Sequence, residues 1–350
     1  AIQACDWSSD VCSSDLWSLE KPTRITINWW SPTGIFVAED EKLTKQRKEE
    51  AQKKDPTANG VTEPLRDPSV PWDEAQLLIP GTSIRGALRS RASRIARTVL
   101  AARDELSKFA SHDLHEQIAA EPNLVRYMFG STEYRGAITV HDCLSTERGK
   151  RIEVTHNAID RWTGGVIDGG LFTEAVYLGT EWEPITIDID LRQLLNNIEA
   201  EKGPEDDGKT VGADETGIGS EDREQSKPTH ADYAHAAYVL LGLVLAELSA
   251  GTLPLGSRST RGLGQVVVST IKVEGADRKS VDLPSWNFTG CEALQQPAIG
   301  AVIMTDPLYE GQCKLAEQVL KHLKDKYEET DWSKRLENGP GAAHKQSEGT

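Results

Sequence analysis

Long apolar runs and paired cysteines are both missing from this sequence. The longest apolar segment, Ala236–Leu248, is interrupted by Gly242 and Glu247 and is too short to span a bilayer, so it predicts a buried helix and no membrane partner. The 5 cysteines are scattered and odd in number, which fits reduced thiols better than a disulfide framework. No secretory signal is recognisable, and we therefore expect a cytoplasmic protein.

The first 16 residues are not expected to be native sequence. Asp10–Leu16 reads DVCSSDL, which is the in-frame translation of a common sequencing adapter. We therefore leave Cys5 and Cys12 out of every site argument. We expect one domain over residues 17–335 and a disordered polar tail over residues 336–350.

Acidic side chains are absent from Leu77–Arg103, although the chain carries a formal net charge of −16. An apolar run leads into Pro80-Gly81-Thr82-Ser83, and helical spacing follows, with Thr82 or Ser83 as the expected N-cap. The predicted buried face consists of Ile84, Leu88, Ile95 and Val99. The arginines of this helix are Arg85, Arg89, Arg91, Arg94, Arg97 and Arg103. Such a helix suits a polyanion, because guanidinium groups bind phosphates in bidentate geometry; the alternative is a basic face paired with acids elsewhere.

A glycine-rich loop, GSRSTRGLG at Gly256–Gly264, precedes a predicted strand. It lacks the closing Gly-Lys-Ser/Thr of a P-loop, but its glycines permit an anion-binding nest to which Arg258 and Arg261 add charge. A plain flexible connection is the alternative.

A second glycine-rich segment, Asn157–Phe172, surrounds Trp162, Leu171 and Phe172. A hairpin with such apolar tips can wedge between bases, because stacking tolerates any sequence. The alternative is an ordinary loop whose aromatic side chains enter the core.

The order of predicted elements is strand, helix, strand, strand, helix, strand. The strands are Thr23–Trp30, Gly136–Asp142, Thr186–Leu191 (an edge or half-exposed strand) and Gln265–Val273. This order predicts an α+β fold with an RRM-like or ferredoxin-like sheet and large loop insertions. One insertion, at residues 196–228, is acidic and nearly free of large apolar residues, so we expect it to be disordered.

Three of these segments resemble signatures of the RAMP (repeat-associated mysterious protein) superfamily of CRISPR effector subunits. IPGTSIRGALRS is similar to the first-helix signature, IDRWTGGVIDGGLF to the thumb segment, and GSRSTRGLGQV to the closing glycine-rich loop. The three segments occur in the family's order. The resemblance is closest to the backbone subunits of type III complexes, and the backbone subunits of type VII systems are similar to the type III kind.

The resemblance implies an RRM-like palm, a thumb hairpin at about residues 151–185, and copies that stack along a guide RNA as a filament. The residues it assigns to RNA are Ser83, Arg85, Arg89, Trp162, Leu171, Phe172, Arg258, Arg261, Gly262 and Gly264. The partners it implies are the CRISPR guide RNA, target RNA, further copies of the chain, a different RAMP-type subunit capping the guide, and a separate nuclease. Binding requires no cofactor.

Relatives that cleave target RNA carry an aspartate in the pattern D-x-P-[VL]-x-[RK]-D-P, where it acts with a divalent metal. Here VTEPLRDP retains the Arg-Asp-Pro end but has Thr62 at the aspartate position, or Glu63 if the register shifts by one. We favour a subunit that does not cleave; the alternative is a Mg²⁺-dependent endoribonuclease using Glu63 or Asp67.

Two further sites are weaker. His156 is a candidate acid or base if the chain instead processes the precursor transcript. His112 with His115, and His141 with Cys143, are possible zinc ligands, but no CxxC pair accompanies them and we expect no zinc.

Overall fold

The computed structural model describes residues 22–40, 60–102, 121–202, 230–275, 286–289 and 306–332, with isolated positions at 42, 44–46, 49, 53 and 336. The adapter-like residues 1–16, the zinc candidates His112 and His115, and most of the acidic insertion lie outside these ranges. No helix within the described ranges is long and apolar enough to cross a bilayer.

The palm is a five-stranded antiparallel sheet. Its strands lie in the order β10 (Trp286–Thr289), β9 (Val267–Glu274), β1 (Thr23–Trp30), β8 (Ile185–Ile189) and β3 (Ile138–Val140). Apart from β10, which the sequence did not predict, the order is that of the βαββαβ fold, with the fourth, first, third and second strands side by side. The α+β, ferredoxin-like prediction is therefore confirmed.

The sequence predicts an edge or half-exposed strand over residues 186–191; strand β8 is half-exposed, as its alternating burial shows, but it is not an edge strand. Strand β8 lies between two neighbours, with Ile187 opposite Ile25 of β1 and Asp188 opposite Thr139 of β3. Its alternation arises because the isoleucines face the helices, while Thr186 and Asp188 lie on the outer face of the sheet.

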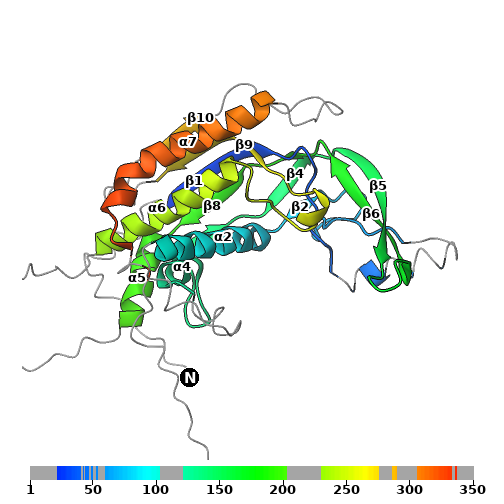
Figure 1. Ribbon diagram of the computed structural model, residues 1–350, viewed down its shortest axis with the longest axis horizontal. Helices are drawn as coiled ribbons and strands as arrows, with labels where there is room; N and C mark the ends of the chain where they lie inside the picture. Colours follow the sequence, from blue (N-terminus) through cyan, green and yellow to red (C-terminus); the bar gives the residue numbers. More distant parts are fainter. Residues whose placement is uncertain are drawn as a thin grey trace, which may run out of the picture.

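Helices cover one face of the palm sheet (Figure 1). Helix α2 (Gly81–Ala102) follows β1, α6 (His230–Ser249) follows β8, and α7 (Asp306–Glu329) packs on α6. The buried face of α2 contains Ile84, Leu88 and Val99 as predicted, but Ala92 and Ala96 replace Ile95, which is half-buried. Small side chains at these positions bring the α2 backbone close to the core, and the arginines occupy the remaining faces.

Shorter elements surround the palm. Helix α4 (Asn123–Phe129) packs on α2, and a small sheet joins β2 (Leu78–Ile79), β4 (Cys143–Glu147) and β7 (Glu181–Trp182). Helix α5 (Leu191–Lys202) corrects the prediction of disorder from residue 196, because Leu194 and Ile198 are buried and hold this helix against the core. Leu336 is also buried, so the predicted tail does not begin there.

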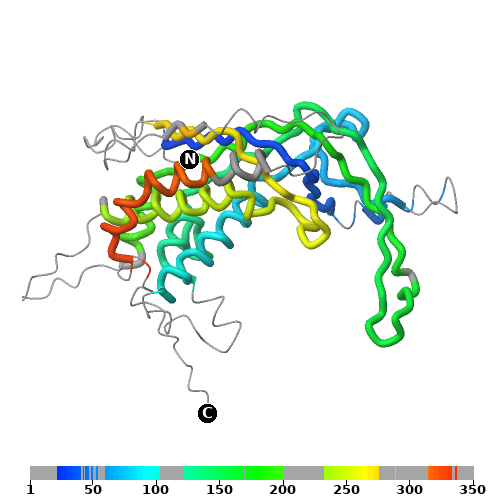
Figure 2. Tube along the Cα trace, turned by 45° about the horizontal axis from the view of Figure 1, so that its top comes forward, coloured from blue at the N-terminus to red at the C-terminus, as the bar shows by residue number. Residues whose placement is uncertain are grey.

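The thumb is a long hairpin of β5 (Lys150–Ile159) and β6 (Val166–Leu178), which projects from one end of the palm (Figure 2). It ends at Leu178, before the predicted limit of residue 185, because the following strands return to the palm. Its turn is closed by Asp160, whose carboxylate accepts hydrogen bonds from the Trp162 N–H at 3.1 Å and the Thr163 hydroxyl at 2.9 Å. These bonds lower the pKa of Asp160.

Candidate nucleic-acid interface

The N-terminus of α2 is capped by a residue that the sequence did not reveal. The Gly81 N–H donates to Asp142 Oδ1 at 2.7 Å. A Cβ at Gly81 would lie 2.1 Å from the carbonyl oxygen of Val140, so only glycine fits there. The helix is already under way at Ser83, whose N–H donates to the Pro80 carbonyl. The prediction of Thr82 or Ser83 as N-cap is therefore wrong, and the Asp142 carboxylate lies at the positive end of the helix dipole.

The two arginines assigned to the guide are held by α4 and the residues before it. Arg85 donates to the carbonyl of Phe129, and burial together with the charges of Arg89 and Arg135 lowers its pKa. Arg89 forms a bidentate pair with Glu121, with Nε 3.1 Å from Oε1, and the pKa of Arg89 is raised by that hydrogen bond. Both guanidinium groups are thus positioned in advance, and the side chain of Arg89 is 38% exposed.

The remaining arginines of α2 divide between two sides. Arg91 pairs with Glu247 of α6 at 2.6 Å and belongs to the helix packing. Arg94 and Arg97 line an open groove of about 660 Å³ along α2, which also includes Arg89 and Glu121. This groove, lined further by Gly86, Ser90, Ser93 and Thr98, is the part of the helix where an extended polyanion can lie.

The glycine-rich loop precedes strand β9, as predicted, and its two arginines share an acidic partner. Arg258 adopts a left-handed conformation with φ 69°, and Gly262 and Gly264 have φ of 85° and 88°. A Cβ at Gly264 would lie 2.4 Å from the Leu255 carbonyl oxygen. Arg258 Nε and Arg261 Nη1 each lie 2.8 Å from a carboxylate oxygen of Glu174. No sequence pattern marked Glu174, which is 2% exposed on β6.

The tip of the hairpin carries an unusual amount of exposed apolar surface. Trp162 is 96% exposed, and the other large apolar side chains of the tip are Ile159, Val166, Ile167 and Leu171. Phe172 is different: its ring lies 5.3 Å from that of His156 and 5.0 Å from the guanidinium of Arg261. Of the three apolar residues assigned to base displacement, Trp162 and Leu171 belong to this exposed surface, while Phe172 packs towards the glycine-rich loop.

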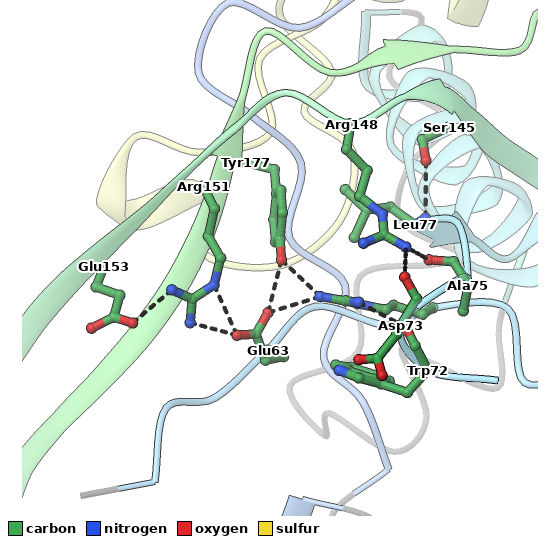
Figure 3. A network of polar contacts seen from close by, with 11 residues as sticks. Glu63, Trp72, Asp73, Ala75, Leu77, Ser145, Arg148, Arg151, Glu153 and Tyr177 are labelled. Carbon is green, nitrogen blue, oxygen red and sulfur yellow. Dashed lines mark hydrogen bonds and ion pairs between the residues drawn. The ribbon is translucent and has the colours of Figure 1, made fainter.

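The two carboxylates named for the Mg²⁺ alternative already accept hydrogen bonds from the protein. Both oxygens of Glu63 are engaged, Oε1 by Arg151 Nε and Nη2 at 3.0 and 2.6 Å, and Oε2 by the Tyr177 hydroxyl at 3.2 Å (Figure 3). The Asp67 carboxylate accepts the Ser69 N–H at 2.9 Å, which lowers its pKa. A cation at Glu63 would have to displace guanidinium groups that already neutralise it. Over the residues that the structure describes, no three His, Cys, Asp or Glu side chains gather as a metal cluster.

The other two zinc candidates, His141 and Cys143, form hydrogen bonds within the protein. His141 Nε2 lies 2.8 Å from Asp188 Oδ2. The Cys143 thiol is buried and donates to the Glu183 carbonyl, and burial raises its pKa to about 12, so a thiolate is disfavoured.

The palm has the strand order of the RRM-like, ferredoxin-like class of folds, and it carries an arginine-lined groove and a projecting hairpin with an exposed apolar tip. A model of the RAMP superfamily matches residues 77–267, more than half of the chain, and this range contains the helix, thumb and loop signatures. The chain belongs to the RAMP superfamily and is therefore a CRISPR-associated RNA-binding subunit. No curated protein matches the chain.

Proposed function

We propose that this chain is a backbone subunit of a type III-like or type VII effector complex. Several copies assemble along the guide RNA, and the resulting filament presents complementary target RNA to a separate nuclease. The observation that carries the proposal is the hairpin tip, where Trp162 and its apolar neighbours lie in solvent on a projecting arm. Apolar side chains that enter between base steps unstack them, and such wedges need this kind of exposed surface.

The groove along α2 supplies the charge that a guide backbone requires. Arg94 and Arg97 line it, and Arg89 is fixed at its rim by Glu121. Arg85 does not line this groove, because its guanidinium donates to the Phe129 carbonyl at the end of α4. A phosphate chain in this groove would meet the guanidinium groups of Arg94 and Arg97, beside the Arg89–Glu121 pair.

The assembly needs the partners that the resemblance implies. These are the guide RNA, target RNA, further copies of the chain, a different RAMP-type subunit capping the guide, and a separate nuclease. The nuclease is needed because Glu63 is held by Arg151 and Tyr177, which supports a subunit that does not cut its target. His156 lies 3.5 Å from Glu174, and its ring contacts that of Phe172 in a tilted arrangement, which supports a packing role over precursor cleavage.

The test is to isolate the tagged complex and extract its RNA. We expect a discrete small RNA, and we expect Arg94→Glu to reduce its recovery strongly while the matched Arg192→Glu does not. Both arginines are exposed on helices, but only Arg94 lines the groove. A complex without small RNA would refute the proposal. Regular Mg²⁺-dependent cuts in target RNA by the complex without a partner nuclease, lost in Glu63→Ala or Asp67→Ala, would instead establish the endoribonuclease alternative.

A further inference from the structure

The base of the thumb presents two different faces, because side chains alternate along its strands. Arg151 of β5 lies opposite Tyr177 of β6, and both belong to one face. His156 lies opposite Phe172, and these two, with Glu174, belong to the other face. Glu63, from outside the hairpin, contacts the first face. Glu174, on the second face, contacts the glycine-rich loop.

Glu63 binds the first face. It accepts two hydrogen bonds from Arg151 and one from Tyr177, and its side chain is 14% exposed (Figure 3). Arg66, which is 7% exposed, donates to the Tyr177 hydroxyl at 2.7 Å and stacks on Trp72 at 3.9 Å. Pairs of this kind between partly buried groups are stronger than surface pairs, because little water screens them.

The segment that carries Glu63 is itself attached to both the thumb and the palm. The Thr62 N–H donates to the Thr173 carbonyl at 2.8 Å, and the Ala175 N–H donates to the Thr62 carbonyl at 2.9 Å. The Leu65 N–H donates to the Val37 carbonyl, which ties the segment to the chain that leaves β1. Glu63 and Arg66 are thus side-chain links between a projecting arm and a fixed frame, and Glu63 is the one that carries the negative charge.

Glu174 binds the second face to the glycine-rich loop. Its two oxygens hold Arg258 and Arg261, and His156 lies 3.5 Å away. The loop is anchored in turn, because the Ser257 and Gly264 N–H groups donate to the carbonyls of Phe36 and Gly34. The hairpin is therefore clamped from both sides at its root, whereas its outer half is exposed.

We propose that Glu63 is a positioning residue that sets the angle of the thumb and so determines which bases its tip displaces. The inference rests on the proposed function of the tip. Beyond Phe172 the arm extends about 20 Å to Val166 at about 3.3 Å per residue, so a rotation of about 10° at its clamped end moves the tip by about 3.5 Å. That displacement is close to the spacing of about 3.4 Å between bases along a strand. A hairpin that is loosely held at its base would therefore contact more than one base position.

The test compares two carboxylates that bind the same arginine. Glu63→Gln removes the charge that joins the hairpin to the 60–67 segment. The matched control is Glu153→Gln, because Glu153 binds Arg151 at 2.6 Å but lies on the hairpin itself. Each variant is assembled as a full complex on a synthetic guide–target duplex with 2-aminopurine at single positions, whose fluorescence rises when the base leaves the stack.

We expect Glu63→Gln to lose about half or more of the fluorescence increase at the positions that the parent displaces. A new fluorescence increase should appear at adjacent positions, and the affinity for RNA should stay within about twofold of the parent. Glu153→Gln should retain the parent pattern. Arg151→Lys is the second variant, because lysine keeps the charge but cannot make both bonds to Oε1, and we expect the same change.

The inference is overturned if Glu63→Gln and Arg151→Lys keep the parent pattern, or if Glu153→Gln changes it equally. It is also overturned if the parent cleaves target RNA with Mg²⁺ and Glu63→Gln abolishes that cleavage. A parent complex that binds RNA without displacing any base refutes the role of the tip in the proposed function, which is a different result from an unchanged Glu63→Gln pattern.

Discussion

Leu171 and Phe172 are neighbours on β6, yet their side chains lie on opposite faces of the thumb. Leu171 is 59% exposed and lies opposite Asn157, whereas Phe172 is half-buried against His156 and Arg261. The resemblance gave both residues the same role of displacing bases. The alternation of the strand separates them into one residue that is available to RNA and one that holds the thumb to the loop.

Truncation of these neighbours should therefore have opposite effects. We expect Leu171→Ala to leave the free energy of unfolding within about 0.5 kcal/mol of the parent, because the side chain is exposed, and to reduce base displacement in the RNA complex. Phe172→Ala should lower the stability by about 2 kcal/mol, since it removes contacts with His156 and Arg261. Urea unfolding and 2-aminopurine fluorescence measure the two effects, and an equal loss of stability in both variants would contradict this division.

Glu174 is the carboxylate whose removal should loosen the thumb most. Glu174→Gln leaves Arg258 and Arg261 facing a neutral amide at a buried position, and breaking such a pair costs about 3 kcal/mol. We expect faster hydrogen exchange in β5 and β6 than in the palm strands. Glu147→Gln, at an exposed position, is the control. If exchange in β5 and β6 were the same in Glu174→Gln and in this control, the pair would not hold the thumb.

Arg94 should contribute to RNA binding through charge alone. We expect Arg94→Ala to weaken binding similarly for all sequences and to reduce the slope of log K against log salt by about 1. Arg192→Ala on α5 should leave that slope unchanged. Titrations of fluorescent RNA over a range of salt concentrations measure it, and equal slopes for Arg94→Ala and the parent would place the guide outside the groove.

Acid should destabilise the palm through Asp188. Its pKa is lowered by hydrogen bonds from Arg24 and His141, so its stabilising contribution is present above the unfolded pKa and is lost as the pH falls through the lower folded value. We expect stability to fall below about pH 4, and to fall less in Asp188→Asn. Thermal melting as a function of pH measures this difference, and parallel curves for the two proteins would rule out Asp188 as the group responsible.

The strands and the first helix of the palm could be predicted because each is marked by a pattern within a short stretch of sequence. Alternating residues in Thr23–Trp30 and 186–189 mark strands, and the spacing of Ile84 and Leu88 marks a helix face. The partners of the arginines could not be predicted, because Arg258 and Glu174, or Arg89 and Glu121, are brought together only by the fold. Asp142 as a helix cap was hidden for the same reason, since it lies 61 residues from Gly81.

The 96% exposure of Trp162 has a consequence for the subunit before it meets RNA. Exposed apolar side chains at the tip of the hairpin favour association in water. The tip of a second subunit can occupy them as well as a base can. If guide RNA covers the tip on assembly, the supply of guide also governs whether newly made subunits stay in solution. Yield and dispersity on expression with and without guide RNA would then report on the same side chains as binding does.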